Sequence, residues 1–232
     1  MPTPIPVDFP LRGVWIAPNT PGTRIPSHGV DMLGERYAYD FGGVDPNSRS
    51  NRVYRPNPLQ YLIAGVRLRD CYGWGAPIYS ATEGVVVQAE DGWPERDPVH
   101  IARDIPNMIK NARIFQDGPG PDLRLLTGNY VIVESSAGYA VYVHAQTGSI
   151  QVSKGERVQP GQQLARVGHS GNSTAPHLHF HLMDDPDPWK AQGILCSFRE
   201  YEVLENDTWH RVENGIPKAT ERIRRLPCLI PN

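Results

Sequence analysis

Three histidines alternate with apolar residues between positions 177 and 182, in the sequence His-Leu-His-Phe-His-Leu. Side chains of a strand point alternately to its two faces, so this period predicts a strand with His177, His179 and His181 on one face. Several imidazoles on one face can bind a divalent metal through neutral ring nitrogens. An exposed strand edge that is rich in histidine would show the same pattern, so the rest of the chain must supply the other parts of a site.

Other groups that can bind zinc or move protons are scattered along the chain. A catalytic zinc needs about three protein ligands, from imidazole or carboxylate, and keeps one position for water. A further imidazole that does not bind the metal can accept or donate the proton of the attacking water. Spacing alone does not choose among the candidates. They are His28, Asp31, Asp40, His144, His177, His179 and His181.

Short strands separated by turns must position these residues. The chain has 22 glycines and 23 prolines among 232 residues, which favours many turns over long helices. Residues 75–80 and 85–89 are expected to pair through a short turn, and 129–134 to form a hairpin with 139–144. Further strands are predicted at 36–41, 177–182 and 201–204.

The fold class that follows is all-β, a mostly antiparallel sheet with few short helices in a single domain with insertions. We expect the domain to span residues 28–205. A proline-punctuated insertion at 92–128 interrupts it and contains a short helix near 103–113. Residues 1–27 form a proline-rich N-terminal segment and 206–232 a C-terminal extension.

The charge balance excludes some partners. The formal net charge is −2, which gives no electrostatic argument for binding to nucleic acid or to an anionic membrane. Three arginines, Arg222, Arg224 and Arg225, form a small basic cluster, which we interpret as the solvated face of a C-terminal helix near 216–225.

The cysteines and the N-terminus give no sign of a disulfide framework or of export. Cys71, Cys196 and Cys228 are odd in number and have no Cys-x-x-Cys spacing, so we expect buried thiols. The first residues contain neither the basic nor the apolar part of an export signal, and no apolar run reaches membrane-spanning length.

Several stretches, in this order, resemble the lysostaphin and LytM type of zinc metallopeptidase, which cleaves cell-wall peptides. The stretch Ser-Gly-Asn-Ser-Thr-Ala-Pro-His-Leu-His-Phe is the most specific, whereas the glycine-rich pieces alone would be weak. The matching stretches are 27–41 with Ser-His-Gly and Tyr-Ala-Tyr-Asp-Phe, 75–87, Tyr-Val-His at 142–144, 155–168 and 170–180.

The resemblance implies a role for each site residue. In that family a first His, an Asp and the second His of His-x-His bind one zinc ion, which here would be His28, Asp40 and His179. The first His of the pair and the His that ends the preceding hairpin serve catalysis, which here would be His177 and His144. The resemblance also implies a groove for an extended peptide, a peptidoglycan substrate, and a location in the cell envelope or outside the cell.

One departure from the family pattern concerns the acidic ligand. The common motif spaces its His and Asp four residues apart, whereas His28 and Asp40 are twelve apart and need a looped excursion to reach one metal. Asp31 is the rival ligand. We prefer Asp40 because Tyr-Ala-Tyr-Asp-Phe is typical of a strand that enters the core, whereas Asp31 lies in a glycine-flanked loop.

Two other interpretations of the sequence remain. Residues 168–172 nearly match the Gly-x-Ser-x-Gly elbow of serine hydrolases, but the last position is Asn and the following residues are unsuited to the helix that such an elbow needs. A non-catalytic domain that binds a wall peptide or serves as a scaffold is the stronger alternative. His169 and His181 are taken as ordinary structural residues, with His181 as a possible neighbour of the ligands.

Overall fold

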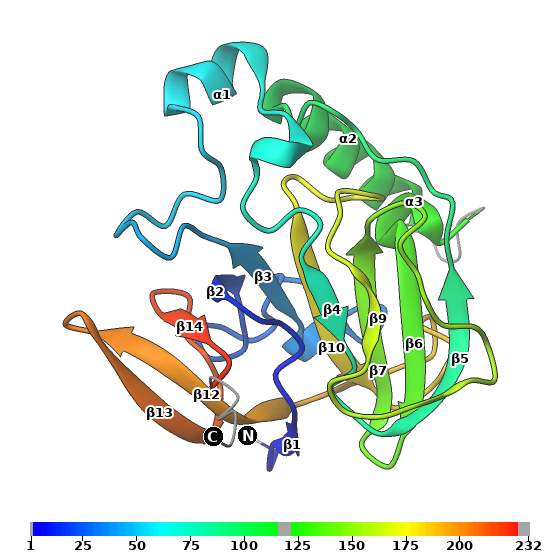
Figure 1. The fold of residues 1–232 in the computed structure, drawn as a ribbon. Coiled ribbons are helices and arrows are strands. Elements are labelled where there is room, and N and C mark those ends of the chain that lie inside the picture. Colours follow the sequence, from blue (N-terminus) through cyan, green and yellow to red (C-terminus); the bar gives the residue numbers. More distant parts are fainter. Residues whose placement is uncertain (1, 116–121, 227–232) are drawn as a thin grey trace.

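A computed structural model describes residues 2–115 and 122–226 of the chain. A large, mainly antiparallel sheet dominates this part of the protein (Figure 1), and the prediction of an all-β fold with few short helices is confirmed. The strand order is β1-β12-β14-β2-β3-β10-β7-β6-β5-β8, with β11 beside β10 and β13 beside β12, and β4 pairs with β9 in a separate small sheet. Only the pairing of β1 with β12 is parallel among the named strands of the described residues.

The elements have the following bounds. The strands are β1 Ile5–Val7, β2 Val14–Asn19, β3 Tyr39–Gly43, β4 Pro77–Tyr79, β5 Gly84–Glu90, β6 Asn129–Ser135, β7 Gly138–Ala145, β8 Arg157–Val158, β9 Gln163–Arg166, β10 His177–Met183, β11 Gly193–Ile194, β12 Cys196–Glu205, β13 Thr208–Gly215 and β14 Arg222–Arg224. The helices are α1 Pro58–Ala64, α2 Ile101–Ile114 and α3 Arg124–Thr127, with 3-10 turns η1 Glu35–Tyr37 and η2 Leu68–Asp70.

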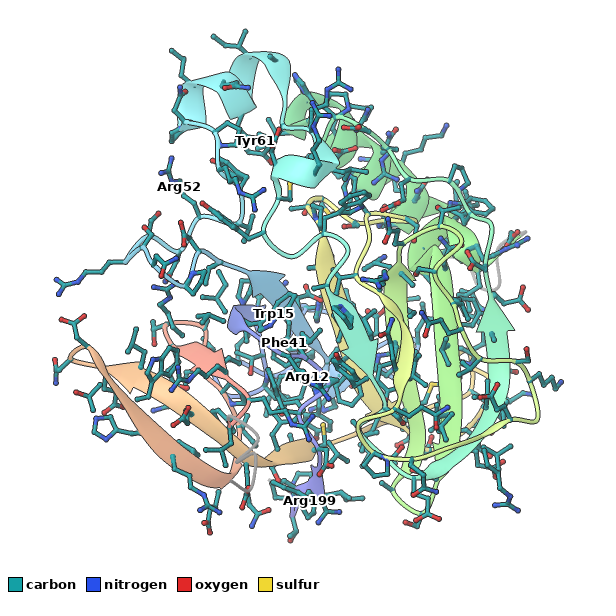
Figure 2. The ribbon with its side chains drawn as sticks, viewed as in Figure 1. Arg12, Trp15, Phe41, Arg52, Tyr61 and Arg199 are labelled. Carbon is teal, nitrogen blue, oxygen red and sulfur yellow. The ribbon has the colours of Figure 1, made fainter. Side chains whose placement is uncertain are left out.

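The core lies against the apolar face of the central strands. Leu178, Phe180 and Leu182 of β10 are wholly buried, as the alternating pattern predicted. Phe198 packs edge-on against Phe41 with ring centroids 5.7 Å apart. Figure 2 shows Phe41 and Trp15 inside the molecule, whereas Arg52 and Arg199 lie at its periphery. Burial of this face fixes the opposite face of β10, which carries the histidines.

Three local predictions are confirmed and one pairing is wrong. The hairpin of β6 with β7, the histidine-rich strand β10 and a helix in the insertion are all present. The predicted pairing of 75–80 with 85–89 does not form: β4 pairs with β9, and β5 pairs with β6 and β8. The residues between β4 and β5 turn a corner between the two sheets, because Ser80 is tied by backbone hydrogen bonds to the segment before β9.

The predicted helix near 216–225 is also wrong. Residues 222–224 form strand β14, in which Ile223 is wholly buried between β2 and β12. Arg222 is therefore not solvated: its side chain is buried and donates to the backbone carbonyls of Asp45 and Ser48. The Arg-Ile-Arg alternation is a strand pattern, and the burial of Ile223 decides in its favour.

Two further expectations concern thiols and membrane spans. Cys71 and Cys196 are buried free thiols, and burial raises the pKa of each to about 12. Cys228 lies outside the described residues. Within the described ranges, no helix has both the length and the apolar character needed to cross a membrane.

Candidate metal centre

Asp40 and His179 face each other across two neighbouring strands. The antiparallel register of β3 with β10 pairs Asp40 with His179 directly, and Asp40 Oδ1 lies 2.9 Å from His179 Nδ1. His28 reaches the same carboxylate from the loop before η1, with its Nε2 atom 2.8 Å from Asp40 Oδ2. One ligand atom from each of the three residues lies within 4.8 Å of the other two.

The three groups fit the donor set of a zinc ion. Zinc binds imidazole nitrogen at about 2.0–2.1 Å and carboxylate oxygen at about 2.0–2.2 Å, so tetrahedral ligand atoms lie roughly 3.3 Å from each other. The contacts of Asp40 with His28 and His179, at 2.8 and 2.9 Å, are shorter by about half an ångström. A small outward shift of the side chains would therefore give zinc spacing, and two nitrogens with one carboxylate are ligands that zinc prefers.

Charge and hydrogen bonds hold the Asp40 carboxylate in place. Burial alone would raise the pKa of Asp40, but the neighbouring His177, His179 and His28 hold that pKa well below its usual range. Burial also lowers the pKa of His28, and the Asp40 carboxylate more than offsets this, so the pKa of His28 is raised. Asn19 donates from Nδ2 to Asp40 Oδ2 at 2.8 Å and orients the carboxylate.

Two further imidazoles lie on the same face. His144 ends β7, and its ring centroid is 4.7 Å from that of His177. The Nε2 atom of His177 lies 3.4 Å from Asp40 Oδ1. The backbone of His144 has φ 65°, a left-handed conformation that residues other than glycine rarely adopt. Residues in such conformations are found preferentially at functional sites.

The hydrogen bonds of these two rings assign their protons. His144 donates from Nδ1 to the carbonyl of Ser170 at 2.9 Å, and His177 donates from Nδ1 to the carbonyl of Ala175 at 2.7 Å. A carbonyl only accepts, so Nδ1 carries a proton in both rings, and in the neutral form Nε2 keeps its lone pair. Burial lowers the pKa of His177, but Asp40 more than offsets this and raises it, so without a metal Nε2 of His177 can also carry a proton toward Asp40 Oδ1. Burial, together with His177 and His179, lowers the pKa of His144 well below its usual value, so this ring is neutral.

The remaining candidates fall into two groups. Asp31 is half exposed and pairs with Arg36, so it does not join the cluster. His181 is buried, and its Nδ1 atom lies 3.2 Å from His179 Nε2, on the side of that ring away from Asp40. Sequence reasoning missed Asn19, because nothing in the sequence relates it to Asp40 before the register of β2 with β3 is known.

The serine-hydrolase interpretation is wrong. Ser170 is wholly buried, and its hydroxyl donates to the carbonyl of Ala145 at 2.8 Å and accepts from the amide of Asn129 at 3.0 Å. No helix follows it, since residues 171–176 are turns and bends that lead directly into β10. The serine therefore fastens two strands and offers no free nucleophile.

Comparison with known proteins gives the family. Residues 110–191, which include His144, His177 and His179, match the model of peptidase family M23. The chain is 39% identical over 102 residues to the peptidoglycan DD-endopeptidase ShyC of Vibrio cholerae serotype O1, a match covering 43% of this chain and 22% of that protein. It is 40% identical over 57 residues to ShyB, named as the same kind of enzyme in the same organism, covering 24% of this chain and 13% of that protein.

Solved structures that match part of the chain include the catalytic domain of lysostaphin from Staphylococcus simulans. The sequences are 24% identical, the match covers 61% of this chain and 85% of that one, and the TM-score is 0.34. The curated relatives are much longer than the segments that match, which span at most 22% of their length. By the family match and the identity to the two endopeptidases, residues 110–191 of the chain belong to peptidase family M23.

Proposed function

We propose that the protein is a zinc-dependent endopeptidase that hydrolyses peptide bonds of bacterial peptidoglycan in the cell envelope. One observation carries the proposal: donor atoms of His28, Asp40 and His179 converge within 4.8 Å, from three separate parts of the chain. His144 and His177 stand beside this group, each anchored through Nδ1, and His177 Nε2 lies 3.4 Å from Asp40 Oδ1. The names of the matched relatives support peptidoglycan as the substrate class.

The three converging residues would hold the metal. His28 Nε2, Asp40 and His179 Nδ1 are the atoms that face one another, so they are the proposed ligands. Zinc bound there would acidify a water molecule and polarise the carbonyl of the scissile bond. Asn19 fixes the carboxylate, and Ser27 Oγ, 3.0 Å from His28 Nδ1, fixes that ring, so the ligands are oriented before the ion binds.

His144 and His177 would handle protons and the developing negative charge. Each ring is anchored through Nδ1, which directs Nε2 as the atom that accepts a proton from water or donates one to the leaving amine. A protonated ring also stabilises an oxyanion. Positioned acid–base groups of this kind contribute roughly a hundredfold or more each to the rate.

The test combines metal content with hydrolysis. We expect the purified protein to bind one zinc per chain and to clear a peptidoglycan suspension, and His179→Ala to lose both properties. His210→Ala is the matched control, because that imidazole is exposed on β13 and lies outside the cluster. Full zinc content without hydrolysis would favour the non-catalytic scaffold, and absence of zinc would refute the proposal.

A further inference from the structure

Both proposed catalytic histidines are held by one loop, residues 168–175, which connects β9 to β10. Ser170 of this loop accepts from His144 Nδ1, and Ala175 accepts from His177 Nδ1. The loop therefore sets the orientation of both rings. Whatever holds the loop also controls the direction of their Nε2 atoms.

The insertion that contains α2 holds this loop. Arg96 donates to the carbonyls of Gly171 and Ser173, each at 2.6 Å. Asp104, in the first turn of α2, accepts from Arg96 Nε at 2.8 Å and from the amide of His100 at 2.8 Å, and its side chain is wholly buried. A buried carboxylate needs such partners, so this arrangement is specific.

A series of contacting side chains links Asp104 to His177. His169 is wholly buried, with Nε2 3.4 Å from Asp104 Oδ2 and Nδ1 3.0 Å from Ser173 Oγ. Ser173 Oγ in turn lies 3.2 Å from His177 Nδ1. The contacts therefore run from Asp104 to His169, then to Ser173, and then to His177.

The chemistry of the two ends fixes the proton positions between them. Burial alone would raise the pKa of Asp104, but the neighbouring His169, Arg103 and other donors hold it well below its usual range, so the group is a carboxylate. Burial lowers the pKa of His169, so that ring is neutral and carries one proton. His169 Nε2 is buried and, among the described residues, makes no closer polar contact than this 3.4 Å approach to Asp104, which is too poorly aligned for a hydrogen bond as it stands. A carboxylate only accepts, so we assign the His169 proton to Nε2, where a small movement of the ring would complete the bond.

The remaining bonds follow from that tautomer. With its proton on Nε2, His169 accepts at Nδ1 from the Ser173 hydroxyl, and Ser173 Oγ is then free to accept from His177 Nδ1. The competing arrangement turns the hydroxyl to the carbonyl of Ala175, 2.7 Å away. That arrangement would leave two lone pairs, on His169 Nε2 and Asp104, facing each other across 3.4 Å.

We propose that Asp104 and His169 are positioning residues for the peptidase reaction. They orient the Ser173 hydroxyl so that it shares the Nδ1 proton of His177, which keeps the lone pair of His177 Nε2 directed at the site. The inference rests on the proposed function. It assigns a role to the insertion, which reaches the ring of His177 through this series of contacts. Asp104, His169 and Ser173 do not touch the proposed ligands, so their proposed role is to orient the ring of His177.

The kinetic test compares Asp104→Asn, Ser173→Ala and the double variant. Each single substitution should lower kcat about 10- to 100-fold with KM nearly unchanged, the usual effect of removing a supporting partner. The double variant should be no slower than the slower single variant, because both substitutions interrupt the same series of contacts. Multiplied effects would make Asp104 an anchor of the loop only and would overturn the proposal.

A matched control and a second readout separate this inference from the proposed function. Asp122→Asn removes a carboxylate of the same insertion that pairs with Arg124 and should leave kcat unchanged. Imidazole ¹⁵N spectra of the zinc-loaded protein need no activity: they should show His169 protonated at Nε2 and His177 at Nδ1. A wild-type His169 protonated at Nδ1 would overturn the proposal even if the protein hydrolyses peptidoglycan.

Discussion

At the scale of the residue, Asp40 organises the candidate centre. Its two oxygens contact different partners: Oδ1 faces His179, and Oδ2 faces His28 and Asn19. Removing this carboxylate would leave the buried imidazole of His179 and the half-buried imidazole of His28 without a shared acceptor, and a metal site with one ligand fewer. Asp31, the rival in the sequence, instead makes a half-exposed ion pair with Arg36.

The two aspartates should therefore respond differently to the same substitution. Asp40→Asn is expected to lose stoichiometric zinc and to lower peptidoglycan hydrolysis at least about 100-fold, since an amide is a poor substitute for an anionic ligand. Asp31→Asn should keep zinc content and activity within about twofold. Metal analysis and turbidity assays on both variants measure this, and the reverse ranking would assign the ligand to Asp31.

Zinc affinity should fall on the acid side, and the pKa directions give the sign. A proton competes with zinc for the ring nitrogen, so the metal needs neutral imidazoles. Burial lowers the pKa of His28, but the opposite effect of the Asp40 carboxylate is larger. The pKa of His28 therefore lies above the ordinary histidine value of 6.5. Affinity should therefore begin to decline above pH 6.5 as the pH falls. A chelator competition from about pH 8 to pH 5 checks this, and a constant affinity over that range would contradict it.

At the scale of the element, local alternation was predictable and pairing was not. The His-Leu-His-Phe-His-Leu pattern and the apolar residues of the 129–144 hairpin are periodic within a few residues, so β10, β6 and β7 were correctly predicted. The partner of β4 is β9, which lies more than eighty residues later, and no local pattern reports such a contact. The same limit explains β14, whose strand conformation depends on β2 and β12.

The apolar face of β10 should be the more sensitive face for stability. Phe180 is wholly buried and packs against Tyr142 with ring centroids 5.2 Å apart. Phe180→Ala should lower the free energy of unfolding by about 3–5 kcal/mol through lost burial and a residual cavity. Leu59→Ala, on the exposed face of α1, should change it by less than about 0.5 kcal/mol. Urea unfolding measures both, and equal effects would contradict the assignment of the core.

At the scale of the whole molecule, the site depends on long-range topology. The candidate ligands and proton carriers come from positions 28, 40, 144, 177 and 179, and β10 brings them together because it lies between β3 and β7 in the sheet (Figure 1). The sequence supplied the residue types, and the resemblance supplied their roles. The twelve-residue spacing of His28 and Asp40 needed the fold, since the loop and η1 between them return His28 to the carboxylate. Strands from the N-terminal segment 1–27 and from 206–232 join this same sheet.

The most direct test is diffraction from crystals grown with zinc, with anomalous data collected at the zinc absorption edge. We predict one strong peak per chain, about 2.0–2.2 Å from His28 Nε2, an Asp40 carboxylate oxygen and His179 Nδ1, with His144 and His177 beside it and not bound. Absence of that peak at saturating zinc, or a peak bound by Asp31 instead of Asp40, would contradict the account.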